Sequence, residues 1–177
     1  LMGTAPPLID VELGDGTYYS PRRVGSGAVD ALAATTATVY PTVVGAADPS
    51  RPKADLGDGT KGWTFQVQLT NLSDAAHTYT LGGQALSEMV EEGLFLEHSQ
   101  IWAGAGISLT FSGDGVAEAG DAQQITVPAK SNATVTVTVT PESEFAAFAS
   151  ENAPKGTFID GALTFTSEDG TPSLTVP

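Results

Sequence analysis

The sequence contains no cysteine and few basic residues. Among its 177 residues there are 7 Lys and Arg against 21 Asp and Glu, so the formal net charge is −14 at pH 7. Without cysteine, neither a disulfide framework nor a thiolate metal site can form. Phosphate contacts need clustered Lys and Arg, and the sequence has no basic run. We therefore expect no nucleic-acid partner, and anionic membranes should repel the chain.

Long apolar runs are missing as well. No stretch approaches the roughly 20 apolar residues that a membrane helix needs, so we expect no membrane insertion. The opening residues, LMGTAPP, do not form a signal peptide, and the chain stops within the strand-like Leu174–Val176. We therefore expect a piece excised from a longer protein. Its hydrophobic content of 41% is enough for the core of one domain.

What the sequence does contain is a strictly alternating stretch near Pro141. Val135, Val137 and Val139 alternate there with threonines. Successive side chains of a strand point to opposite faces, so the valines should be buried and the threonines should face water. β-branched residues suit such a half-buried surface. One wet face is typical of an antiparallel sheet, and a second sheet must then cover the valines.

Two hairpins are predicted from turn residues between alternating segments. Pro128–Asn132 separates a short strand at Ile125–Val127 from the threonine–valine strand. Trp63–Thr70 also alternates, and it is followed by the turn Asn71–Asp74 and by a strand that includes His77. We predict that the two strands of each pair lie side by side in one sheet.

The remaining segments complete the pattern of a β-sandwich. About seven to nine short strands follow Thr36, with turn residues between them. We predict an all-β protein with a fibronectin-III or immunoglobulin-like antiparallel β-sandwich, and the absence of a cysteine pair favours the fibronectin-III-like version. Gln84–Glu92 fits either a helical turn or an extended strand. The other expected elements are strands at Thr36–Val44 (with Pro41 at a sheet edge), Leu94–Leu96, Ile107–Ser112, Phe158–Thr166 and Leu174–Val176, and a helix at Ser143–Ser150.

The N-terminal residues follow a different pattern. Leu8–Leu13 and Thr17–Tyr19 are predicted to form two short strands around a Gly-Asp-Gly turn. An alanine-rich helix should follow, with Ser26 as its N-cap and its end near Thr35. We therefore expect a small N-terminal segment with a short helix before the sandwich.

Several segments, taken in order, resemble one protein family. QVQLTNLSDAAHTYTL, ITVPAKSNATVTVTV and GTFIDGALTFTS are similar to the fibronectin-III-like domain of cell-envelope subtilisin-like serine proteases, of the lactocepin and C5a-peptidase type. SPRRVGSGAVDALAA at residues 20–34 resembles the helix that closes their catalytic domain. LMGTA at residues 1–5 resembles the end of the helix that begins at their nucleophile. Gly3 in place of the usual Asn and the long stretch Gln84–Gly106 depart from the family pattern.

This resemblance implies a domain organisation and a function. Residues 1–34 would be a remnant of a subtilase catalytic domain, and residues 35–177 would be a fibronectin-III-like sandwich. The fragment would be a non-catalytic accessory domain of an extracellular serine endopeptidase on the cell envelope of a Gram-positive bacterium. It would support its own catalytic domain, contact neighbouring domains or the protein substrate, and tune substrate choice. Four apolar residues of the remnant should then find a surface on the sandwich or on a neighbouring molecule: Leu8, Ile9, Val29 and Leu32.

No catalytic, cofactor-binding or metal-binding residue is predicted. The family's nucleophile motif, Gly-Thr-Ser-Met-Ala, and its His and Asp motifs do not occur in this sequence, so no triad residue carries over. His98 next to Ser99 suggests a triad, but we favour a histidine in a loop at the end of a strand. His77 lies on the apolar face of a strand beside Tyr79, which favours a packed histidine over a ligand.

Acidic turns offer one alternative. Their acidic residues stand beside glycines, as hairpin turns require, and they do not match the spacing of a calcium-binding EF-hand loop. We therefore favour turns over a weak Ca²⁺ site and expect no cofactor at Asp15, Asp55, Asp58, Asp114, Glu168 and Asp169. Asn71 and Asn132 match the glycosylation sequon, which is short and common, so we give it little weight.

A different function for the same sandwich is a stand-alone, adhesin-like or glycan-binding module at the cell surface. Fold alone does not decide between the two, because function resides in sites added to a fold. Trp63 and Trp102 are the candidate platforms for sugars. Trp63 alternates with core residues and should be buried, whereas Trp102 lies in a loop whose structure the sequence leaves open. A patch of exposed aromatic side chains on one face would favour glycan binding.

Overall fold

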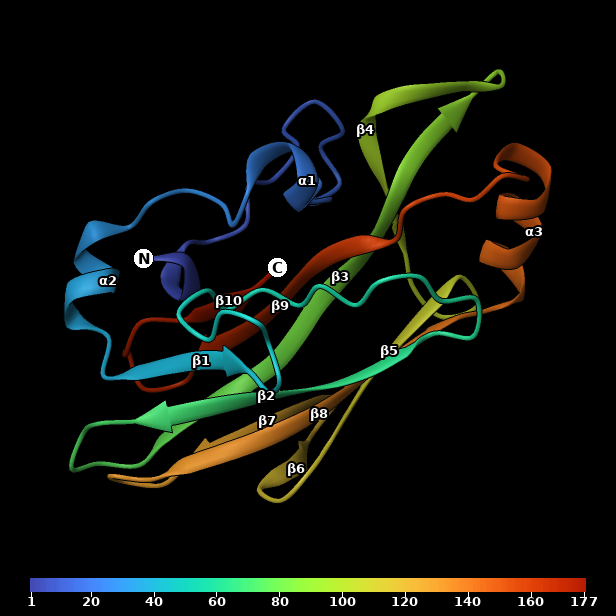
Figure 1. The fold of residues 1–177 in the computed structure, drawn as a ribbon. Helices are drawn as coiled ribbons and strands as arrows, with labels where there is room; N and C mark the ends of the chain where they lie inside the picture. Colours follow the sequence, from blue (N-terminus) through green and yellow to red (C-terminus); the bar gives the residue numbers. More distant parts are fainter.

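The computed structural model describes all residues from Leu1 to Pro177. Its strands are β1 (Val39–Val43), β2 (Trp63–Asn71), β3 (His77–Glu91), β4 (Leu94–Trp102), β5 (Ile107–Ser112), β6 (Val116–Ala119), β7 (Ala122–Val127), β8 (Asn132–Pro141), β9 (Asp160–Ser167) and β10 (Leu174–Val176). One sheet has the order β1-β2-β8-β5, and the larger sheet has the order β10-β9-β3-β7-β6, with β4 also paired to β3 (Figure 1). All strand pairs are antiparallel, so the predicted all-β sandwich is confirmed.

The core lies between the two sheets. Along β8 the predicted alternation holds, because Val135 and Val137 are fully buried and Thr136 between them is partly exposed. The larger sheet contributes two fully buried aromatic side chains to the same cluster, Tyr79 and Phe165. Burial of one such side chain stabilises the fold by about 1.5–3 kcal/mol.

Both predicted hairpins are wrong. Short turns join β2 to β3 and β7 to β8, but in each case the two strands lie in opposite sheets. β2 pairs with β8 instead, and β7 pairs with β3. Alternation determines which side chains of a strand are buried, but it does not determine which strand lies beside it. Both turns therefore cross from one sheet to the other.

The segment Gln84–Glu92, for which helix and strand were both open, is extended and forms the second half of β3. β3 and β4 are joined by a tight turn in which Glu92 has φ 50° and Gly93 has φ 78°, the conformation that a two-residue hairpin requires. Beyond Leu86, β3 pairs only with β4. Residues 87–100 therefore form a two-stranded arm that leaves the sandwich (Figure 1).

The N-terminal segment, residues 1–38, adds no strand to either sheet. The two strands predicted here are reduced to an isolated bridge between Ile9 and Tyr18. The segment also contains a short 3₁₀ helix, η1 (Met2–Thr4), and the helical turn α1 (Pro21–Val24). It lies over the larger sheet as an irregular layer (Figure 1).

The predicted helix of this segment starts later than expected. It is α2 (Ala31–Thr36), and Asp30 rather than Ser26 is its N-cap. Gly27 explains the delay, because its φ of 119° is not helical. The N–H of the following residue donates to the carbonyl of Pro6 at 3.0 Å, so the chain is held extended there before the helix can begin.

Other predicted elements are confirmed. The helix α3 (Ser143–Asn152) extends the predicted helix by two residues, and β9 and β10 pair as expected. Pro41 lies in β1, at the edge of its sheet, where a residue without an N–H costs no sheet hydrogen bond. No helix is long and apolar enough to cross a membrane.

Candidate functional site

Charged and polar side chains fix the N-terminal segment to the larger sheet; we call this set of contacts the joint. Asp160, at the start of β9, accepts hydrogen bonds from the Ser20 hydroxyl at 2.5 Å and from Nε of Arg22 at 2.6 Å. The Arg22 guanidinium also lies 3.9 Å from Glu88 and faces the ring of Phe158 at 4.2 Å. Arg22 thus connects the N-terminal segment to β3, to β9 and to the loop that precedes β9.

An irregularity in β4 forms the second half of the joint. The pairing with β3 shifts register after Glu88, which leaves residues 96–98 of β4 opposite a single residue of β3. The carbonyl groups of Leu96 and Glu97 accept hydrogen bonds from the guanidinium of Arg23 instead. Bulges redirect side chains, and here the bulge turns His98 toward the N-terminal segment.

His98 meets a buried carboxylate. Asp10 is fully buried and accepts hydrogen bonds from Nδ1 of His98 at 2.7 Å and from the backbone N–H of Glu12 at 3.1 Å. Burial raises the pKa of Asp10, but the hydrogen bonds from His98 and Glu12 outweigh it, and the pKa lies below its ordinary value. The hydrogen bond with Asp10 in turn raises the pKa of His98. A buried carboxylate needs such a partner, so the joint fixes the segment in one position.

Sequence interpretation missed these residues. Gln84, which completes the joint, donates to the Gly16 carbonyl and accepts from the Tyr18 N–H, both at 2.8 Å. The position of Asp10 inside the apolar run LIDVEL was the only indication in the sequence that this carboxylate is buried. Its partner His98 lies 88 residues away, so the pair itself could not be predicted.

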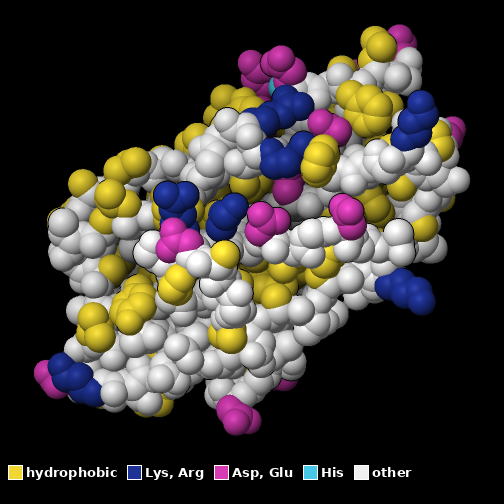
Figure 2. Space-filling view, in the orientation of Figure 1, with side chains coloured by type: hydrophobic (Ala, Val, Ile, Leu, Met, Phe, Trp, Pro, Cys, Tyr) yellow, Lys and Arg dark blue, Asp and Glu magenta, His cyan; other side chains and the backbone are white.

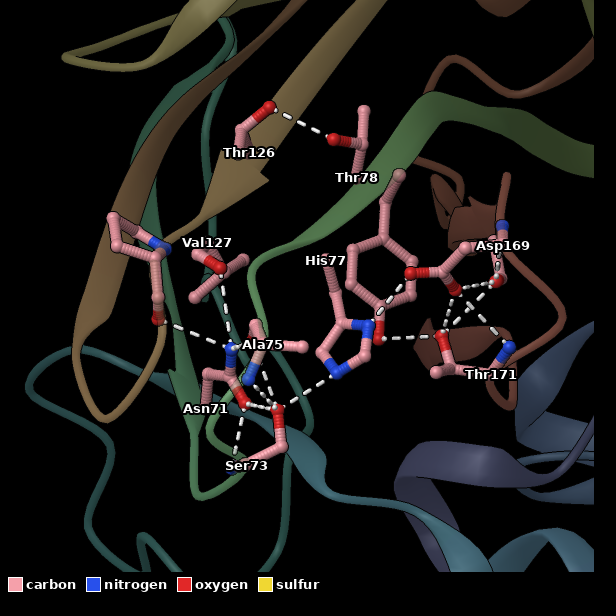
Figure 3. Close-up of polar contacts among 12 residues, drawn as sticks. Asn71, Ser73, Ala75, His77, Thr78, Thr126, Val127, Asp169 and Thr171 are labelled. Atoms are coloured by element: carbon pink, nitrogen blue, oxygen red, sulfur yellow. Dashed lines mark hydrogen bonds and ion pairs between the residues drawn. The ribbon is translucent and has the colours of Figure 1, made fainter.

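A second polar cluster joins the turn between β2 and β3 to the turn between β9 and β10. His77, at the start of β3, stands between Ser73 and Asp169 (Figure 3). Its Nδ1 is 2.6 Å from the Asp169 carboxylate, and its Nε2 is 2.8 Å from the Ser73 hydroxyl. The hydrogen bond with His77, and then that with Thr171, hold the pKa of Asp169 well below its ordinary value. His77 is buried, as the packed position predicted for it requires.

Ser73, His77 and Asp169 contact one another in the sequence of a Ser–His–Asp triad, but the groups around Ser73 are not arranged for catalysis. In a triad the serine proton passes to the histidine, and N–H groups aimed at the substrate oxygen stabilise its charge. The Ser73 hydroxyl also lies 2.8 Å from the Asn71 side-chain oxygen and 2.9 Å from the Ala75 carbonyl, and both can only accept its proton. The N–H of Ala75 points at the hydroxyl itself, at 3.3 Å. We therefore assign the cluster a structural role.

Residues 55–177 match the family model described as Fn3-like domain. The chain belongs to the Fn3-like domain family. The matched range contains every strand from β2 to β10, whereas β1 and the N-terminal segment lie outside it. No curated protein matches the chain. The fibronectin-III-like fold predicted from the sequence is thereby confirmed.

The two histidines and several of the acidic side chains have polar partners within the chain. His98 lies within β4 and not in a loop at the end of a strand, and it pairs with Asp10 and not with Ser99. Asp15 accepts the N–H of Thr17 at 2.9 Å, and the Asp55 carboxylate lies 3.5 Å from the Lys53 ammonium group. The structure contains no group of three or more His, Asp or Glu side chains that could hold a metal ion.

The indole N–H groups of both tryptophans of the Fn3-like domain donate to partners within the chain. The indole N–H of Trp102 donates to the Ser87 hydroxyl at 2.9 Å, and its ring packs against two phenylalanines of α3 at centroid distances of 5.3 and 5.2 Å. Trp63 is half-buried rather than buried, and its indole N–H donates to the Gly57 carbonyl at 3.2 Å.

We expect no hydrolytic activity from the Fn3-like domain. A depression of about 540 Å³ beside Ser73 and His77 could admit a small substrate, but two acceptors, the Asn71 side-chain oxygen and the Ala75 carbonyl, compete with His77 for the Ser73 proton. Casein should stay intact, and a fluorophosphonate probe should leave Ser73 unlabelled when the peptides are read by mass spectrometry. Labelling of Ser73 that disappears in His77→Gln would contradict this expectation.

The joint should be most stable at mildly acidic pH. Asp10 has a lowered pKa, so its contribution is present above about pH 4 and is lost as the pH falls through its folded pKa. His98 has a raised pKa, so its contribution is complete below about pH 6.5 and is lost as the pH rises through its folded pKa. The melting temperature should therefore be highest between about pH 4 and pH 6.5, and it should decrease both at lower and at higher pH. In His98→Gln the alkaline decline should be weaker; an unchanged decline would show that this pair does not cause it.

Proposed function

We propose that this Fn3-like domain is a non-catalytic accessory domain of an extracellular subtilisin-like serine endopeptidase, attached to the cell envelope of a Gram-positive bacterium. In this proposal residues 1–34 are the end of the catalytic domain, and residues 35–177 are the accessory sandwich. The sequence resemblance of both parts motivates the proposal. The observation that carries it is the way in which the N-terminal segment lies on the sandwich.

The N-terminal segment turns its polar side chains inward and its apolar side chains outward. Its buried side chains include those of Asp10, Thr17 and Ser20. In contrast, Val29 and Leu32 are 76% and 74% exposed, and hydrophobic side chains gather on the surface around α2 (Figure 2). A segment that folded only against the sandwich would bury such residues. The same outward position is found for Leu1, Leu8, Ile9 and Val11. We infer that the rest of the catalytic domain covers them.

The connection between the two parts is short. α2 ends at Thr36 and β1 begins at Val39, with no flexible Gly- or Ser-rich linker between them. Together with the joint, this connection leaves the sandwich little freedom to move relative to the N-terminal segment. A neighbour in a fixed position can shape the distal part of a substrate cleft without donating a catalytic group, which is the role that we propose.

The alternative, a glycan-binding module, lacks an aromatic platform. The exposed aromatic side chains Tyr40, Phe95 and Phe158 lie in β1, in β4 and in the loop before β9. The ring of Phe158 is also occupied by the guanidinium of Arg22. Sugar binding needs aromatic faces that are grouped and free, so we favour the accessory domain.

The decisive experiment compares the intact protease with a form truncated at Thr36. The coding sequence before Leu1 should contain the Gly-Thr-Ser-Met-Ala motif. Truncation should lower the melting temperature of the catalytic domain or change its cleavage preference, because the fixed neighbour is lost. Arg22→Ala should reproduce part of this effect, whereas Arg51→Ala, which breaks only an exposed pair with Asp48, should not. If the truncated enzyme keeps both its melting temperature and its preference, the domain is only a spacer.

A further inference from the structure

We propose that the tip of the arm formed by β3 and β4 is an interaction surface for a positively charged, partly apolar polypeptide segment. The tip comprises residues 89–95, the part of the arm farthest from the sandwich. This proposal does not depend on the accessory role proposed above, because it concerns a different part of the surface and can be tested with the isolated chain.

The arm is held only at its base. At the base, Ser87 is buried, Glu88 approaches Arg22, and the bulge of β4 is capped by Arg23. Beyond Glu88 the two strands pair with each other and with no third strand. A two-stranded ribbon of this kind is only marginally stable in water on its own. The tip therefore projects from the protein with both of its faces accessible.

Apolar side chains occupy the tip. Leu94 and Phe95 are 68% and 51% exposed. Phe95 lies opposite Val90 in the ladder, so these two side chains form an apolar pair on one face of the ribbon. Leu94 projects from the other face, opposite Glu91. Figure 2 shows hydrophobic and acidic side chains side by side at the end of the arm, at the upper right. Large exposed apolar side chains grouped within a polar rim are typical of interaction sites.

The rim of this surface carries one sign of charge. Glu91 and Glu92 are exposed and form no ion pair, whereas Glu97 belongs to the base, where its carbonyl accepts a hydrogen bond from Arg23. No Lys or Arg occurs between Gln84 and Trp102. The carboxylates of Glu91 and Glu92, next to Leu94 and Phe95, create a negative potential that attracts cationic groups and steers them to the tip.

The negative charge of the tip indicates which kind of partner binds there. An anionic membrane surface would be repelled by these carboxylates. A second copy of this chain is a poor partner, because five of its seven Lys and Arg are already engaged: Arg22, Arg23, Arg51, Lys53 and Lys130. In a segment of another polypeptide with alternating basic and apolar residues, the basic residues can pair with the carboxylates of the tip and the apolar residues can pack against its apolar side chains.

Binding can be measured with a short fluorescent peptide that alternates lysine and valine. Fluorescence anisotropy at low salt should show binding to the isolated chain, weaker binding of a lysine–glycine peptide and none of a glutamate–valine peptide. Leu94→Thr with Phe95→Thr should lower the affinity about tenfold or more, because it removes the apolar anchors. Glu91→Gln with Glu92→Gln should lower it about fivefold and reduce its dependence on salt.

Matched variants distinguish binding at the tip from nonspecific attraction of the peptide to the negative net charge of the chain. Tyr40→Thr removes an exposed aromatic side chain from β1, and Glu118→Gln removes a carboxylate from β6; both should bind the lysine–valine peptide as the wild type does. All the substituted side chains are exposed, and unchanged melting curves verify the fold. The proposal is wrong if no peptide binds, if tip and control variants lose affinity equally, or if sedimentation shows self-association through the tip instead.

Discussion

Replacing Val137 with Asp should destabilise the protein by several kcal/mol, on the order of 3–5, whereas Thr136→Asp should cost less than about 1 kcal/mol. Val137 is fully buried in β8 and lies between Phe65 of β2 and Phe111 of β5 in the sheet. A carboxylate at this position would have neither water nor a cation, so it must either stay unpaired or take up a proton. The loss should therefore approach the whole stability of a small domain.

Thr136 is the matched control because it is adjacent in sequence and belongs to the opposite face. Its hydroxyl is partly exposed and accepts a hydrogen bond from the Gln66 side chain at 3.3 Å, a contact that an Asp can replace. Midpoints of urea unfolding measure the difference. If Val137→Asp does not accumulate as folded protein, Val137→Thr should show a smaller loss, because only a hydroxyl is then buried. Similar midpoints for the two Asp variants would contradict the alternation of β8.

The same strand shows how far the sequence determines the fold. The spacing of its valines predicts which side chains are buried, since that depends only on the period of a strand. The choice of neighbouring strand depends on how the two sheets close around the core, and a turn such as Pro128–Asn132 can serve a hairpin or a crossing between sheets. The sequence favours a hairpin in both places because short turns usually join neighbouring strands. The structure has crossings at both.

The contacts of the joint could not be predicted from the sequence, for a related reason. Its contacts join residues far apart in the chain, such as Arg22 with Asp160 and Asp10 with His98. No local pattern specifies such pairs, and the bulge that aims His98 at Asp10 leaves no trace in the periodicity of β4. By contrast, the packed position of His77 was predictable, since it follows from its place on the apolar face of β3. Its partner Asp169, 92 residues away, was interpreted only as part of a turn.

Asn71 holds the two crossings together. It ends β2, it is buried, and its side-chain nitrogen lies within hydrogen-bond distance of three carbonyl oxygens (Figure 3). These belong to Ala75 in the first turn, at 2.7 Å, and to Val127 and Pro128 in the second, at 3.2 and 3.1 Å. Its side-chain oxygen accepts the N–H of Ser73 at 2.8 Å. One amide thus satisfies buried groups of both turns, and it is too enclosed to serve as a glycosylation site.

Asn71→Asp should therefore cost roughly 3 kcal/mol or more at neutral pH. Aspartate has nearly the same shape, but it places an oxygen where the donor nitrogen stood and turns negative charge toward three carbonyl groups. This burial raises the pKa of the new carboxyl group in the folded state, so the destabilisation is complete above that pKa and is relieved as the pH falls. Asn132→Asp is the matched control, since Asn132 is the exposed asparagine of the other sequon.

Urea unfolding at several pH values separates charge from shape in this comparison. Asn132→Asp should follow the wild type, which loses stability below about pH 4 because Asp10 and Asp169 have lowered pKa values. Relative to Asn132→Asp, Asn71→Asp should regain part of its lost stability between about pH 7 and pH 5, because a protonated carboxyl group can again donate a hydrogen bond. Equal midpoints for the two variants at neutral pH would mean that the amide does not tie the turns together, and that packing of the two sheets alone holds both crossings.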